Sequence, residues 1–169
     1  MKFNDISQLT KSPNYEVSLE WQYLESTIER YGAVDPDFQR LHVWTEQQQI
    51  AYVEYIMRGG KSGRDLYFNQ ADWGGKYKAP MYLVDGKQRL NAVLRFLHNE
   101  IAVFGGHYRR DFEGRLPSAF TFTIHVNDLQ TYREVVTWYL EMNAGGTPHT
   151  EEELNKAREL LNAADPAKV

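Results

Sequence analysis

The sequence predicts a single α+β domain, a small mixed sheet flanked by several helices. Two observations lead to this fold class: short apolar or alternating runs typical of strands lie between segments with helical periodicity, and 169 residues are enough for one domain with its own core. We divide the chain into an N-terminal helical extension (1–35), a motif-bearing core (36–126) and C-terminal helices (127–169).

The composition narrows the classes of protein to which the chain can belong. It has no cysteine, which excludes disulfides, thiolate catalysis and Cys-based zinc sites. No apolar run approaches the ~20 residues that span a bilayer, and the first residues lack the pattern of a signal peptide. We therefore expect a cytoplasmic protein without a membrane partner. The net charge of −4 argues against a wholly basic nucleic-acid-binding surface, but a positive excess within 36–115 allows one anion site.

The first third of the chain predicts two helices joined by an extended segment. Apolar residues at helical spacing, among them Leu19, Leu24 and Ile28, indicate a helix over residues 18–31. Pro36 prevents its continuation. A capping box at residues 45–48 begins the second helix, which the glycines after Arg58 end.

The middle of the chain predicts strands and one helix. The expected strands are residues 66–69, 79–84, 101–108 and 120–126, and the last of these alternates so that one face is buried. A helix is expected from about 86 to 98, directly after the second strand. The segments 70–78 and 109–119 are expected to be loops, with 70–78 containing two glycines.

Two further helices are predicted in the C-terminal part. Asp128 is expected to cap a helix that runs to about Asn143, where the following glycines end it. Thr150 and Glu153 form a second capping box, which predicts a final helix.

The candidate site is the segment Asp85-Gly86-Lys87-Gln88-Arg89, where a strand is expected to turn through glycine into a helix. Such a junction presents backbone amides without intrahelical partners at the positive end of the helix dipole, which suits an anion such as phosphate. Lys87 supplies a point charge and Arg89 a two-pronged donor. Asp85 could hold a metal ion, orient Arg89 or accept a proton. The alternative is a tight Asp-Gly turn followed by solvated helix residues.

Two other segments could contribute to the same anion site. Gln39 and Arg40 are expected in extended chain just before a capped helix, close to Trp44. Asn143 stands at a helix end, and the glycines after it could close over a bound group. Each segment also has a structural explanation, because Arg40 could pair with a neighbouring aspartate and Asn143 could be a plain helix stop.

Two loops have the composition of nucleic-acid contacts. The loop after residue 108 carries Arg109 and Arg110 beside aromatic residues, and the loop 70–78 carries Lys76 and Lys78 near an aromatic residue. Cations bind phosphates and aromatic rings stack on bases, so a groove for a single strand or a DNA end would form if both loops flank the turn. The alternative for each is a solvated loop.

These segments, in this order, resemble a known family. It is the ParB-like domain of unknown function found in the N-terminal half of Gmr-type modification-dependent restriction enzymes and in related phage-defence proteins. The pattern P-x-[YF]-Q-R-x-x-x-W is matched by Pro36, Phe38, Gln39, Arg40 and Trp44. The pattern [IVL]-D-G-Q-Q-R-L is matched by Val84, Asp85, Gly86, Gln88, Arg89 and Leu90, with Lys87 in place of the first glutamine. A later segment corresponds to Asn143, Thr147, Glu153 and Leu154.

The resemblance implies a nucleotide-binding domain, with triphosphate hydrolysis in many relatives and DNA cleavage in some. Carried over to this sequence, the phosphates would be cradled by Asp85, Gly86, Gln88 and Arg89. Gln39 and Arg40 would complete the pocket, and Asn143 would border it. The nuclease activity of longer relatives is not expected to carry over, since the five histidines are scattered without metal-ligand spacing.

The leading expectation is therefore a domain that binds a nucleoside triphosphate with Mg²⁺, in a DNA-related or phage-defence setting, and whether it also hydrolyses the nucleotide stays open. Asp85, Gln88 and Arg89 are the candidate catalytic residues, and Lys87 would help Arg89 to offset phosphate charge. Asp85 or Glu141 would orient the water or the metal ion. Two rivals are a small DNA-nicking nuclease and a non-enzymatic regulator that binds DNA or a protein.

Overall fold

The computed structural model describes residues 15–31, 33–34, 44–73, 75–76, 78–144, 155–156, 159 and 162–163. Within these residues the sheet has five strands in the order β1-β5-β3-β4-β2. The strands are β1 (Tyr15–Glu20), β2 (Ala33–Val34), β3 (Asp65–Asn69), β4 (Met81–Asp85) and β5 (Thr121–Asn127). Antiparallel pairs β1–β5 and β3–β4 alternate with parallel pairs β5–β3 and β4–β2, so the sheet is mixed.

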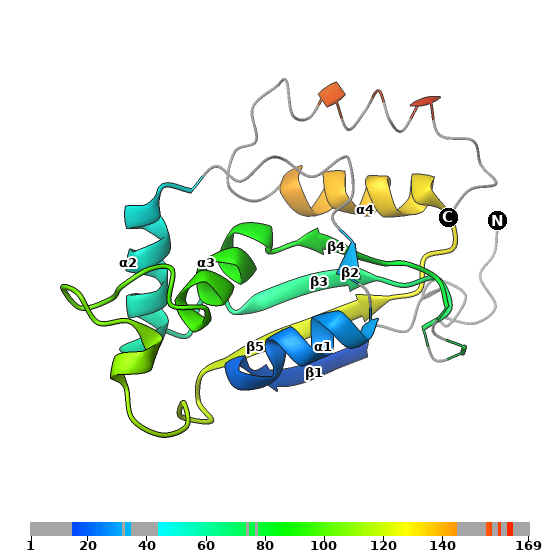
Figure 1. Ribbon diagram of the computed structural model, residues 1–169. Coiled ribbons are helices and arrows are strands. Elements are labelled where there is room, and N and C mark those ends of the chain that lie inside the picture. Colours follow the sequence, from blue (N-terminus) through cyan, green and yellow to red (C-terminus); the bar gives the residue numbers. More distant parts are fainter. Residues whose placement is uncertain are drawn as a thin grey trace.

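Helices cover both faces of the sheet (Figure 1). One face packs on α1 (Leu24–Tyr31), α2 (Glu46–Met57) and α3 (Lys87–Leu97), and the other packs on α4 (Tyr132–Ala144). Alternation along β4 explains the two layers, because Leu83 belongs to the larger core and its neighbour Val84 to the core beneath α4. The predicted α+β class with a mixed sheet and flanking helices is confirmed.

The N-terminal segment differs from the predicted helix over residues 18–31. Residues 15–20 form the edge strand β1, a 3₁₀ turn follows at Trp21–Tyr23, and α1 begins only at Leu24. The strand pairs with β5, and Leu19 lies opposite Phe122. The sequence Y-E-V-S-L-E alternates apolar and polar residues, as in a strand, and its last residues also fit helical spacing. Pairing with β5 selects the strand. The described part of residues 1–35 therefore contributes the strands β1 and β2 to the sheet as well as the helix α1.

The central elements lie close to their predicted positions. Strands β3, β4 and β5 overlap the predicted runs, and α3 occupies the predicted helix after β4. The predicted strand 101–108 is wrong. Its only pairing among the described residues is an isolated bridge between Val103 and His107, around a turn in which Phe104, Gly105 and Gly106 all have positive φ. Two consecutive glycines permit that turn, and a strand cannot contain it.

The start of α4 also differs from the prediction. Asp128 does not cap it; Thr131 does, since its hydroxyl accepts the Glu134 amide at 3.2 Å while the Glu134 carboxylate accepts the Thr131 amide at 3.0 Å. The capping box is thus T-x-x-E, three residues later than expected. The second predicted capping box, at residues 150–153, lies outside the described residues.

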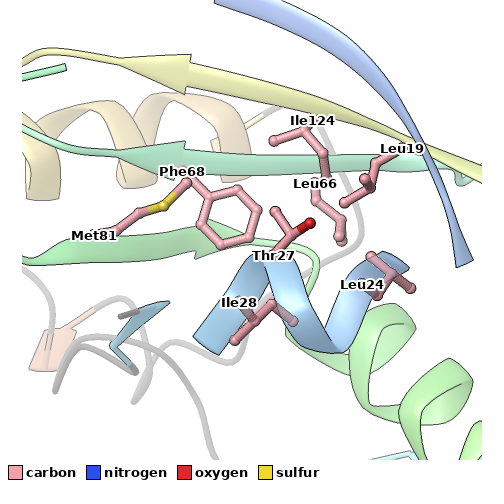
Figure 2. A pocket seen from close by; sticks show the side chains of 8 residues that line it. All are labelled: Leu19, Leu24, Thr27, Ile28, Leu66, Phe68, Met81 and Ile124. Carbon is pink, nitrogen blue, oxygen red and sulfur yellow. The ribbon is translucent and has the colours of Figure 1, made fainter. Parts of the chain in front are cut away.

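A small apolar pocket lies between α1 and the sheet (Figure 2). Helix α1 contributes Thr27 and Ile28 to its wall, and the sheet contributes Leu66, Phe68 and Met81. The Thr27 hydroxyl is the polar group among the labelled side chains around it. The pocket therefore marks a place where side chains of α1 and of the sheet do not pack closely.

Candidate functional site

The turn between β4 and α3 depends on Gly86. Its φ of 109° lies in the left-handed region, and a Cβ added there would come within 2.3 Å of Leu66 Cδ2 and 3.3 Å of the Asp65 carbonyl oxygen. Only glycine satisfies both the backbone conformation and the close approach of β3. The predicted strand–glycine–helix junction is present, and the fold alone is sufficient to require this glycine.

Asp85 and Arg89 form an ion pair across this turn. Arg89 Nη2 donates to Asp85 Oδ2 at 2.6 Å, and the two side chains are 19% and 40% exposed. Of the three roles considered for Asp85, orienting Arg89 is the one that this geometry displays. Because both side chains keep contact with solvent, the pair is expected to stabilise the fold only weakly, and an anion could compete with the carboxylate for the guanidinium.

Gln88 links the turn to the second motif. Its side chain is buried, and Oε1 accepts the Trp44 amide at 3.1 Å. Trp44 directly precedes the capping box of α2 and its ring packs on Tyr52. Gln88 therefore fixes the end of the segment that carries Gln39 and Arg40, which themselves lie outside the described residues.

A glycine-rich loop that the sequence reasoning missed lies beside the turn. Residues 59–64, Gly-Gly-Lys-Ser-Gly-Arg, precede β3, and β3 runs antiparallel to β4. The start of β3 consequently lies next to the end of β4. A Cβ added to Gly63 would come within 4.0 Å of Arg89 Cδ. The signal was present in the composition of the loop, but only the strand pairing connects it to the turn.

Arg89 also lies near two tyrosines whose pKa values are raised. Burial raises the pKa of Tyr52 and that of Tyr67, and the charge of Arg89 opposes the rise in both. Tyr52 donates its hydroxyl to the Gly63 carbonyl at 2.6 Å, so α2 fixes the glycine-rich loop against the turn. Both phenols consequently stay protonated at neutral pH and can act as hydrogen-bond donors.

The loops with predicted nucleic-acid contacts do not flank the turn. Lys76 and Lys78 lie between β3 and β4, at the end of β4 opposite Asp85, and Figure 1 shows this loop far from α3. The Arg110 amide donates to Asn99 Oδ1 beyond the C-terminal end of α3, on the order of 15 Å from the turn for a helix of this length. The Arg109 guanidinium donates hydrogen bonds to the carbonyls of Phe112 and Gly114. The condition for the groove, that both loops flank the turn, is therefore not met.

The last turns of α4 lie near the end of β4. Tyr139 belongs to the same apolar cluster as Val84, the residue before Asp85, and the helix continues to Ala144. Asn143 belongs to this end of α4, although its side chain lies outside the description. Glu141 is exposed. The role of Asn143 at the border of the pocket therefore stays a prediction.

On the sheet face beneath α4, His125 is held in a polar cluster. Its Nε2 lies 2.9 Å from Asp65 Oδ1, its Nδ1 lies 3.7 Å from Glu16 Oε2, and its ring stacks on Tyr67 at 4.5 Å. Within the described residues, no three His, Asp or Glu side chains come together so that they could hold a metal ion. The cluster therefore ties β1, β3 and β5 together.

Comparisons with protein-family models, with curated proteins and with solved structures give no match. None of the helices in the described part of the chain has the length and apolar character needed to cross a membrane.

Proposed function

We propose that the chain is a ParB-like domain that binds a nucleoside triphosphate at the turn between β4 and α3. The hydrogen bond from the Trp44 amide to Gln88 Oε1 carries the proposal, because it joins the two motif-bearing segments at the N-terminal end of one helix. The same end of α3 supplies the positive end of a helix dipole and two cationic side chains, Lys87 and Arg89.

The residues at the turn suit a triphosphate. Arg89 can offer two parallel donors to phosphate oxygens and Lys87 a point charge. A Mg²⁺ ion carried by the nucleotide would neutralise phosphate charge, and Asp85, with its side chain 40% exposed, is a carboxylate at the turn that could approach it. The close packing of Gly86 on β3 holds these groups on rigid elements.

Hydrolysis would follow from an exchange of partners at Arg89. When a phosphate takes the guanidinium, the Asp85 carboxylate loses its ion-pair partner and can orient water or accept its proton. The water oxygen would bond to the terminal phosphorus as the bond to the leaving diphosphate breaks. Arg89 and Lys87 would offset the developing charge, which is the main contribution a protein makes to phosphoryl transfer.

A thermal-shift comparison tests binding. Wild type is measured with ATP, GTP, CTP and each diphosphate, with and without Mg²⁺. Ligand at 100 times its Kd stabilises by about 2.7 kcal/mol, a shift of several degrees at this size. Arg89→Gln should abolish the shift. Arg109→Gln is the control, because the Arg109 guanidinium donates to the carbonyls of Phe112 and Gly114 in a loop beyond the other end of α3.

Two results would overturn the proposal: no nucleotide shifts the wild-type transition, or Arg89→Gln keeps the wild-type shift. Phosphate release from the nucleotide that binds then tests turnover. Asp85→Asn should bind that nucleotide and release phosphate at least tenfold more slowly than wild type.

A further inference from the structure

In the loop between α2 and β3, the amide and the hydroxyl of Ser62 both lie within hydrogen-bond distance of a single oxygen atom. Tyr55, on α2, places its phenolic oxygen 2.6 Å from Ser62 Oγ and 3.3 Å from the Ser62 amide nitrogen. The pKa of Tyr55 lies below its usual value, first because of the Ser62 side chain and then because of the amides of Ser62 and Lys61. Converging amides of this kind form the nests that bind anion oxygens in proteins.

The ring of Tyr55 lies directly on the glycine-rich loop. A Cβ added to Gly60 would come within 2.4 Å of the Tyr55 ring. Tyr55 is nevertheless 42% exposed, one of the most exposed large hydrophobic side chains among the described residues. A side chain so placed can leave the loop without opening the core.

The loop and the turn at Gly86 are adjacent. Gly63 faces Arg89, and the Tyr52 hydroxyl holds the Gly63 carbonyl. Lys61 is exposed and forms no ion pair with another described residue. Arg64, by contrast, is committed to the carbonyls of Gly60 and Ala119, which fixes the end of the loop. Two sets of anion donors on separate elements therefore lie side by side.

We propose that residues 60–63 form a second phosphate cradle, that the Tyr55 hydroxyl occupies it as an internal substitute for a phosphate oxygen, and that the ligand is a chain of two or more phosphates spanning this cradle and the turn. This inference rests on the proposed function and adds the ligand class: a nucleoside di- or triphosphate binds and a monophosphate does not. Binding displaces the Tyr55 hydroxyl from Ser62.

Two variants that delete the same hydrogen bond test the inference. Tyr55→Phe removes the competing oxygen and keeps the ring on Gly60, whereas Ser62→Ala removes a donor from the cradle. Affinities for ATP, AMP, inorganic tripolyphosphate and inorganic phosphate are measured by titration calorimetry at constant Mg²⁺. Tyr55→Phe should tighten the binding of ATP and tripolyphosphate, and Ser62→Ala should weaken it, each by about three- to tenfold, the range of one hydrogen bond.

A bond that merely stabilises the loop would make both variants change in the same direction. Equal or parallel effects of Tyr55→Phe and Ser62→Ala therefore overturn the inference, as does equal affinity of wild type for ATP and AMP. Arg89→Gln separates this failure from that of the proposed function. Suppose that ATP binds, that Arg89→Gln abolishes binding, and that Tyr55→Phe and Ser62→Ala change the affinity in the same direction: then only the second cradle is wrong. If wild type binds no polyphosphate, both proposals are wrong.

Discussion

The turn between β4 and α3 requires glycine at position 86, and the stability that depends on this glycine can be measured without any ligand. Gly86→Ala combines a left-handed φ of 109° with a Cβ placed 2.3 Å from Leu66 Cδ2. We expect it to lower the free energy of unfolding by about 2–4 kcal/mol, from backbone strain and overpacking together. Urea denaturation at neutral pH measures the loss.

Gly59→Ala is the control for Gly86→Ala. Its φ of 93° is similarly left-handed, but an added Cβ meets nothing within 4 Å. This variant should show only the backbone cost, about 1–2 kcal/mol. Equal losses in the two variants would mean that β3 can move away from the turn, contrary to the close packing inferred here.

Tyr52 makes stability depend on pH in the alkaline range. Burial raises its pKa in the folded protein, so the folded state keeps the phenolic proton to a higher pH than the unfolded chain does. Its contribution to stability is complete below about pH 10 and falls as pH rises further, by about 1.4 kcal/mol per pH unit for one proton. Urea denaturation from pH 9 to 11 should show a shallower decline for Tyr52→Phe. The pKa of Tyr67 is also raised, so the test compares how stability falls with pH in wild type and in Tyr52→Phe. Parallel declines in the two proteins would contradict the role assigned to Tyr52.

At the scale of elements, the start of α2 rests on a capping box that the sequence predicts. Thr45 Oγ1 accepts the Gln48 amide at 3.3 Å and Gln48 Oε1 accepts the Thr45 amide at 2.8 Å. Thr45→Ala should destabilise the protein by about 1 kcal/mol, since one helix amide loses its partner. Thr45→Ser keeps the hydroxyl and should stay near wild type in the same denaturation measurement. A neutral alanine variant would mean that Gln88 alone positions this end of α2.

A substitution at the contact between α1 and the sheet should increase the stability of the protein. Thr27 is the polar residue that lines an otherwise apolar pocket. Thr27→Val keeps the shape of the side chain and removes that hydroxyl, and we expect a gain of about 0.5–1 kcal/mol in the free energy of unfolding. Thr137→Val is the control in α4, where the hydroxyl donates to the Arg133 carbonyl at 2.8 Å, and it should give no gain. A gain in both variants would point to a general effect of valine.

Across the whole molecule, the two cores share one sheet and should unfold together. Adjacent residues of β3 and β4 belong to opposite layers, so the loss of either layer would expose apolar residues of these strands. The four tryptophans sample separate regions: Trp21 the larger core, Trp44 the start of α2, Trp73 the loop before β4 and Trp138 the helix α4. Tryptophan fluorescence and far-ultraviolet circular dichroism should therefore give the same urea midpoint. Separate midpoints would show that α4 or β1 unfolds independently.

Sequence patterns located most elements but misplaced several ends. The alternation in β5 and the capping box of α2 are local signals, and both are confirmed. Residues 15–20 satisfy a strand pattern and part of a helix pattern, and the hydrogen bonds of β5 select the strand. At residues 103–107, β-forming residues could not outweigh two consecutive glycines. A local pattern cannot distinguish strand from helix at residues 15–20, because the strand that pairs with them, β5, lies about a hundred residues away in the sequence.

The sequence by itself determined the α+β class, the strand–Gly86–helix junction and the capping box of α2, because each depends on backbone conformation and hydrogen bonds within a few residues. The tertiary structure decided which other segments reach that junction. Antiparallel pairing of β3 with β4 brings residues 59–64 beside Arg89, and Gln88 holds Trp44 there, while the loops with Lys76 and Arg110 lie elsewhere. Such neighbours depend on the register and order of strands, which arise from the packing of the whole sheet.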